Sequence, residues 1–68
     1  MEGLTIMTGA QIKELRRTLG YTQARLAEEV GVSPNTIARY EREEFKPSPP
    51  VMKLLKLLGM IVTERKAA

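Results

Sequence analysis

The stretch that decides the fold is residues 22–41, TQARLAEEVGVSPNTIARYE. Thr22 is a suitable N-cap for a short helix, and Gly31 suits the left-handed residue that ends it. The apolar residues of this helix recur at helical spacing and are Leu26, Ala27 and Val30. A second helix follows after only a few residues, so the two must cross steeply, as in a helix-turn-helix. Similar short turns also occur in helical corners that bind no ligand.

The second helix carries a row of polar side chains. Ser33 is a good N-cap for it, and Pro34 fits its first position. At 100° per residue, Asn35, Arg39 and Arg42 share the face opposite the apolar residues. Asparagine can pair bidentately with adenine and arginine with guanine, so this row has the chemistry of major-groove readout. A solvated polar face is the alternative interpretation.

Helix start and stop signals place two more helices. Thr8 and Gln11 form a capping box before a helix that ends at Gly20, and Ser48 precedes a helix that we expect to end at Gly59. The predicted core is made of the apolar rows of the four helices: Ile12, Leu15, Leu19, Leu26, Ala27, Val30, Ile37, Tyr40, Val51, Leu54, Leu55 and Leu58. These rows predict an orthogonal all-α bundle.

Composition limits the classes of function. The 68 residues fit one domain, 1–68, with a core at 8–59 and terminal extensions at 1–7 and 60–68. The absence of cysteine and histidine excludes disulfides, the usual zinc sites and catalysis by these residues, so we expect no enzyme, no metal and no cofactor. The net charge of +3 gives a mild attraction to polyanions.

The termini carry short apolar runs. Residues 60–63, Met-Ile-Val-Thr, are β-prone and could pair as a strand with residues 4–7, within the chain or across a dimer; disordered termini are the alternative. The opening residues do not form a signal peptide, and no apolar run is long enough to span a bilayer. We therefore expect a cytoplasmic protein that does not engage membranes.

Three motifs carry a resemblance to a known family. They are I-K-E-L-R-R near the start, T-Q-x-x-L-A-x-x-V-G-V-S-x-x-T-I-x-x-Y-E in the middle, and K-P-S-P later. With them, residues 9–59 resemble the lambda-repressor/Cro-like helix-turn-helix family, also called the XRE family of transcriptional regulators. The resemblance implies a compact bundle of four to five helices with a central helix-turn-helix that binds DNA.

The resemblance also implies which residues contact DNA. Gln23 would brace a phosphate contact and the recognition helix, residues 34–42. The residues expected to face the bases are Ser33, Pro34, Asn35, Thr36 and Arg39. We add Thr22, Arg42 and Lys46 as expected DNA contacts.

Two charged residues fall on the core side of their helices. Arg16 lies in the apolar row of the first helix, and Glu41 turns inward at the end of the third. An unpaired buried charge costs several kcal/mol, so we expect the two to form a structural ion pair. An Arg–Glu pair at these positions also recurs in the family that the chain resembles. The alternative is that Arg16 extends its charge to solvent along the helix edge.

The chain departs from the family pattern after the recognition helix. Glu43 stands where glycine is usual, so the helix either runs longer or places Glu43 at positive φ at a modest cost. Glu43 and Glu44 also put acid where many relatives approach the phosphates, which predicts weaker DNA binding. Arg42 and Lys46 flank these acids and could restore the contact.

Two functions are consistent with these features. The first is a small sequence-specific regulator of transcription, a repressor, that binds double-stranded DNA as a homodimer on a palindromic operator. The second is a protein-interaction module of the same fold, such as an antitoxin-like or anti-repressor component. Its contact residues would be exposed apolar side chains, which we expect to be Met52, Leu57, Met60 and Ile61.

Overall fold

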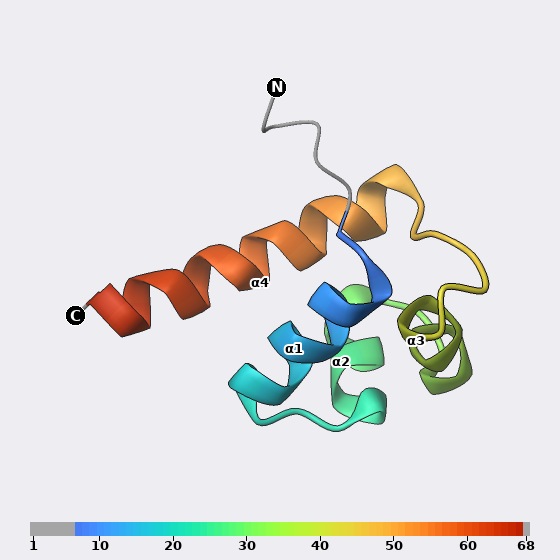
Figure 1. The fold of residues 1–68 in the computed structure, drawn as a ribbon, viewed down its shortest axis with the longest axis horizontal. Coiled ribbons are helices and arrows are strands. Elements are labelled where there is room, and N and C mark those ends of the chain that lie inside the picture. Colours follow the sequence, from blue (N-terminus) through green and yellow to red (C-terminus); the bar gives the residue numbers. More distant parts are fainter. Residues whose placement is uncertain (1–6, 68) are drawn as a thin grey trace.

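A computed structural model describes residues 7–67 of the chain, with side chains up to residue 62. This part contains no strand and has four helices: α1 (Gly9–Leu19), α2 (Gln23–Val30), α3 (Pro34–Glu41) and α4 (Pro49–Ala67). Figure 1 shows α1, α2 and α3 gathered together, while α4 lies across them and its C-terminal half projects beyond them. The all-α architecture predicted from the sequence is confirmed.

Local signals explain where the first three helices begin and end. The hydroxyls of Thr8, Thr22 and Ser33 each accept a hydrogen bond from the backbone N–H three residues later, at 3.1, 3.0 and 3.2 Å. These N-caps satisfy N–H groups that have no partner inside the helix. Gly20 and Gly31 close α1 and α2 at φ of 75° and 79°, a conformation that costs glycine little.

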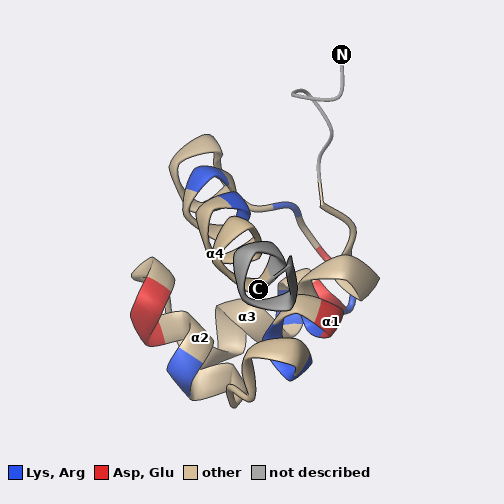
Figure 2. Ribbon diagram, turned by 90° about the vertical axis from the view of Figure 1, so that its left-hand side faces the viewer, with Lys and Arg blue, Asp and Glu red and all other residues tan. Residues whose placement is uncertain are grey.

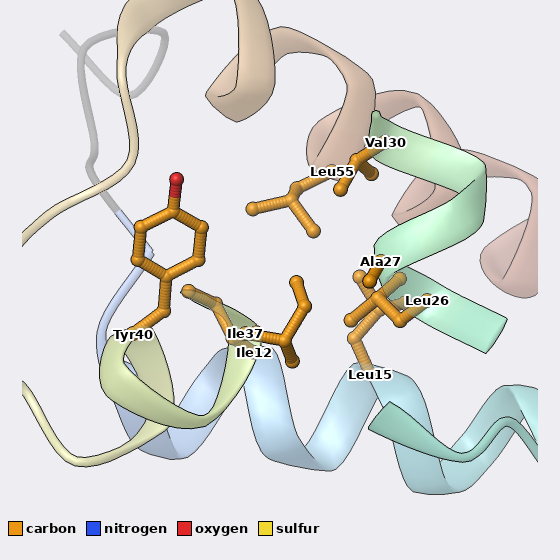
Figure 3. Close-up of a cluster of buried hydrophobic side chains, with 8 residues drawn as sticks. All are labelled: Ile12, Leu15, Leu26, Ala27, Val30, Ile37, Tyr40 and Leu55. Atoms are coloured by element: carbon orange, nitrogen blue, oxygen red, sulfur yellow. The ribbon is translucent and has the colours of Figure 1, made fainter. Parts of the chain in front are cut away.

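The core draws on all four helices. Its buried side chains are Ile12, Leu15, Leu26, Ala27, Val30, Ile37, Tyr40 and Leu55. In Figure 3, Leu55 of α4 lies between Tyr40 of α3 and Val30 of α2. Leu19, Val51 and Leu58 pack against this cluster while partly exposed. The inner face of α3 is thereby fixed against the rest of the bundle.

The predicted core was wrong at one position of α4. Leu54 is 40% exposed, whereas Met52, which we expected at the surface, is only 8% exposed. Leu55 points into the core, and Leu54 lies about 100° around the helix from it while Met52 lies only about 60° away on the other side. Because α4 is apolar around most of its circumference, periodicity alone could not show which edge is buried.

The expected end of the last helix was also wrong. α4 continues through Gly59 to Ala67, so residues 60–63 are helical and form no strand. Val62 continues the row of Val51, Leu55 and Leu58 and packs against the core, and this tertiary contact outweighs the weak β propensity of the segment. Residues 4–6 of the expected partner strand lie outside the described residues.

None of the helices in the described part of the chain is both long enough and apolar enough to cross a membrane.

Candidate nucleic-acid interface

The polar residues of α3 lie on its outer face. Asn35 and Arg39 are exposed, one helical turn apart, while Ile37 and Tyr40 on the opposite face are buried. Figure 3 shows both of these apolar side chains directed into the core. The face that carries Asn35 and Arg39 is therefore held toward solvent by the packing behind it.

The start of α3 presents small polar groups beside this face. Ser33 and Pro34 are exposed and Thr36 is half-buried. The hydroxyls of Ser33 and Thr36 lie 2.9 Å apart and share a hydrogen bond, so the N-cap also orients the threonine.

At the C-terminal end of α3, Arg42 is the C-cap, with φ of −89° and ψ of 2°, so α3 ends one residue earlier than the expected recognition helix. Arg42 and Lys46 are both exposed.

An ion pair ties α1 to the end of α3. Arg16 Nε donates to Glu41 Oε2 at 2.7 Å, and Arg16 Nη1 donates to the carbonyl oxygen of Tyr21 at 3.0 Å. Only 15% of the Arg16 side chain and 6% of the Glu41 side chain are exposed. The structure thus brings together the two residues expected to pair, and Arg16 does not extend its charge to solvent.

Gln23 joins this network from α2. Its amide nitrogen donates to Glu41 Oε1 at 3.1 Å, so the Glu41 carboxylate accepts hydrogen bonds from side chains of both α1 and α2. Thr22, just before Gln23, is exposed and has its hydroxyl engaged in the cap of α2. Three helices meet at Glu41, which fixes the orientation of α3 relative to the two helices that precede it.

The exit from α3 uses the unusual residue Glu43. Its φ is 65°, so the chain takes the left-handed turn rather than a longer helix. The Glu43 carboxylate accepts a hydrogen bond from the backbone N–H of Gly9, at the start of α1. A carboxylate is favourable there, because helix N-termini carry partial positive charge. A Cβ at Gly9 would lie 2.6 Å from the carbonyl oxygens of Tyr40 and Glu41, so only glycine permits this approach.

Glu44 lies between two arginines of the candidate interface. Its Oε2 accepts from Arg42 Nε at 2.7 Å, and its Oε1 lies 3.6 Å from Arg39 Nε. The hydrogen bond from Arg42 lowers the pKa of the Glu44 carboxyl, and the same bond raises the pKa of Arg42. Of the two acids expected to repel phosphate, Glu44 is thus paired with two arginines of the protein itself.

Phe45, which sequence reasoning missed, lies beside Arg39 and Tyr40. The Arg39 guanidinium lies 5.8 Å from the centre of the Phe45 ring, and that ring contacts Tyr40 edge to face at 5.4 Å. Phe45 is 42% exposed despite being large and apolar. A lone aromatic residue beside a charged row was the only signal available in the sequence.

Acidic and basic residues occur together on each of α1, α2 and α3. Figure 2 shows basic and acidic segments close together on α1 and on α2. On α2, for instance, the exposed Arg25 pairs with Glu29 at 3.0 Å and lies over the Tyr21 ring at 4.9 Å. Any recognition of a polyanion by this chain must depend on where particular side chains lie rather than on a broad electrostatic field.

The arrangement of α2 and α3 and the similarity to known proteins indicate the same class of protein. α2 and α3, joined through residues 31–33 and packed through their apolar rows, form a helix-turn-helix. A family model described as "Helix-turn-helix" matches residues 12–59, and the chain belongs to this family, of the XRE type that the motifs predicted. Over 51 residues it is 45% identical to the "Uncharacterized HTH-type transcriptional regulator YgzD" of Bacillus subtilis (strain 168), covering 74% of this chain and 77% of that protein. No solved structure matches.

Proposed function

We propose that the chain is a DNA-binding regulator of transcription that places α3 in the major groove. The observation that carries this proposal is the position of Asn35 and Arg39, exposed one turn apart on a helix whose other face is locked into the core. These are the side chains suited to bidentate contacts with adenine and guanine. The printed name of the Bacillus relative, a transcriptional regulator, supports the same function.

The other expected contacts surround these two residues. We assign Ser33, Pro34 and Thr36, at the N-terminus of α3, to contacts with bases or the adjoining backbone. We assign phosphate contacts to Thr22, Gln23, Arg42 and Lys46. A repressor needs no chemistry beyond occupying its site, so we propose repression as the mode of regulation.

We further propose that the chain acts as a homodimer on a palindromic operator. A helix of eight residues reads only a few base pairs, and a two-fold dimer doubles the length of the site. The outer face of α4 supports association, because four large apolar side chains are between 40% and 59% exposed there. They are Leu54, Leu57, Met60 and Ile61.

Selection from a random DNA pool tests the proposal. A regulator of this kind enriches one half-site sequence, arranged as two copies about one helical turn apart. Its affinity for the enriched duplex should fall linearly on a log–log plot against salt concentration. Failure to enrich any sequence, together with an affinity independent of salt, would falsify DNA binding as the function.

A protein-interaction module remains the second candidate, and the exposed apolar face of α4 is the observation that favours it. That face differs from the surface expected in the sequence, because Met52 is buried and Leu54 takes its place. In this case substitution of Leu54 or Leu57 by lysine abolishes binding to the protein partner. Substitution of Arg39 by alanine leaves that binding intact.

A further inference from the structure

The segment after α3 is held in a fixed position relative to the recognition helix. The backbone N–H of Glu43 donates to the carbonyl of Tyr40 at 3.0 Å, and that of Glu44 donates to the carbonyl of Arg39 at 2.9 Å. The Glu43 carboxylate is bound to the N-terminus of α1, and the Phe45 ring contacts Tyr40. Glu44 therefore projects from a backbone anchored on both sides, and its carboxylate has a defined place beside α3.

The nitrogen atoms that Glu44 contacts decide whether DNA can bind the same arginines. It approaches both Arg39 and Arg42 at Nε, the nitrogen nearest the aliphatic stem. A guanidinium contacts the O6/N7 edge of guanine, or two phosphate oxygens, through pairs of N–H groups in a planar fork. A carboxylate at Nε leaves the two terminal nitrogens available for such a contact, so Glu44 and DNA can occupy the same arginine together.

The Arg39 side chain is thereby confined on two sides. Glu44 Oε1 lies 3.6 Å from its Nε, and the centre of the Phe45 ring lies 5.8 Å from its guanidinium carbon. An unconfined arginine side chain samples many rotamers, and binding a ligand costs free energy because it fixes one of them. Confinement of the side chain before binding lowers this cost. Arg39 is still 49% exposed at the side chain, so the confinement does not remove it from the interface.

We propose that Glu44 is a positioning residue for DNA recognition, which holds Arg39 and Arg42 from the Nε side and so raises the preference for the specific site. The inference rests on the DNA-binding function proposed above. A simple charge argument makes a different prediction, namely that loss of an acid tightens binding to every duplex equally. Removal of an acid near the phosphates should strengthen non-specific binding, whereas removal of the group that orients Arg39 should weaken discrimination.

The test compares two duplexes in the intact chain. One carries the sequence that the wild-type chain selects from random DNA, and the other has the same bases in scrambled order. The variant is Glu44→Ala, and the matched control is Glu14→Ala, which removes an equal charge from an exposed position on α1. Melting curves establish that each variant is folded, as expected from the 46% exposure of the Glu44 side chain.

The expected result is a change in the ratio of the two affinities. Glu44→Ala should bind the scrambled duplex more tightly and reduce the ratio by roughly 3- to 10-fold, the scale of two exposed ion pairs. Glu14→Ala should leave the ratio unchanged. In an Arg39→Ala background most of the effect of Glu44→Ala on the ratio should disappear, since the group to be oriented is absent.

Two outcomes overturn the inference and are distinct from failure of the proposed function. If Glu44→Ala tightens binding to both duplexes equally, Glu44 acts only as a repulsive charge. If Glu44→Ala reduces the ratio of the two affinities as much in the Arg39→Ala background as in the wild-type chain, Glu44 does not act through Arg39. A wild-type chain that prefers neither duplex overturns the DNA-binding function itself, and with it this inference.

Discussion

Three arginine side chains of this chain fall into two groups that differ in burial. Arg16 is 15% exposed and is tied to Glu41 and a backbone carbonyl, whereas Arg39 and Arg42 are 49% and 56% exposed. A charge that is largely removed from water must be paired, and its loss affects the fold. A charge that stays in water contributes little to the fold and is available to a ligand.

Arg39→Ala tests the exposed class. If Arg39 contacts the edge of a guanine, its removal should cost roughly 1–3 kcal/mol of binding free energy and relax the preference at one base position. Competition among duplexes with single substitutions measures this. Lys53→Ala on α4 is the control and should change neither quantity. A loss of affinity that is equal for every sequence would assign Arg39 to a phosphate instead.

Arg16→Ala tests the buried class. The substitution leaves the Glu41 carboxylate, 6% exposed, without its ionic partner, so the free energy of unfolding should fall by roughly 3–5 kcal/mol. A domain of this size has little more stability than that, so the variant should be largely unfolded at room temperature. Urea denaturation of Arg16→Ala beside Arg17→Ala, an exposed neighbour, measures the difference. Similar midpoints for the two variants would contradict a structural role for the pair.

At the scale of the element, two helical glycines have opposite consequences. Gly9 lies where α1 approaches the carbonyls that end α3, and a Cβ there would meet backbone at 2.6 Å. Gly59 lies within α4, and a Cβ added there meets nothing within 4 Å. The first glycine permits contact between two helices, and the second only weakens the helix that contains it.

Substitution of each glycine by alanine should therefore shift the melting temperature in opposite directions. Gly9→Ala must displace the backbone of α1 or α3 and should destabilise the fold. Gly59→Ala should stabilise it by about 1 kcal/mol, the difference in helix propensity. The two variants serve as each other's control because the chemical change is identical. A shift of the same sign in both would contradict the close approach at Gly9.

Local sequence signals predicted most helix boundaries. The features that could not be predicted depend on contacts between residues distant in sequence. The N-caps and the glycines at positions 20 and 31 act within a few residues, so they could be read directly. The continuation of α4 depends on Val62 reaching a core formed by other helices, which no local pattern encodes. At the candidate interface, the exposed row of α3 was predictable. The link from Glu44 to both arginines was not, because it depends on a turn that is held in part by the contact between Glu43 and Gly9, which is distant in sequence.

At the scale of the whole molecule, the outer face of α4 is the surface that we propose for self-association. Its exposed residues Leu54, Leu57 and Ile61 recur at spacings of three and four, the pattern of a helix that pairs with another helix. Truncation after Gly59 would be a poor test of pairing, because it also removes Val62 from the core. Substitution on the outer face alone separates assembly from folding.

The double variant Leu57→Lys with Ile61→Lys should stay folded but become monomeric, as measured by sedimentation at micromolar concentration. It should also lose affinity for a full palindrome while its affinity for a single half-site is nearly unchanged. Lys13→Ala, at an exposed position on α1, serves as the control. A dimer that persists in the double variant would place the interface on another surface, and a monomeric wild-type chain would remove the dimer from the proposal.

The way α3 is anchored has a consequence for how such a protein can diversify. Its inner face is held by the core and its end by Glu41, while Asn35 on the outer face supports none of these contacts. Substitutions at Asn35 can therefore accumulate with little effect on folding, and a lineage can acquire a new binding preference in single steps. Arg39 is less free, because a replacement there gives up Glu44 and Phe45 as neighbours. Preference should thus drift first at the base pair that we propose Asn35 contacts.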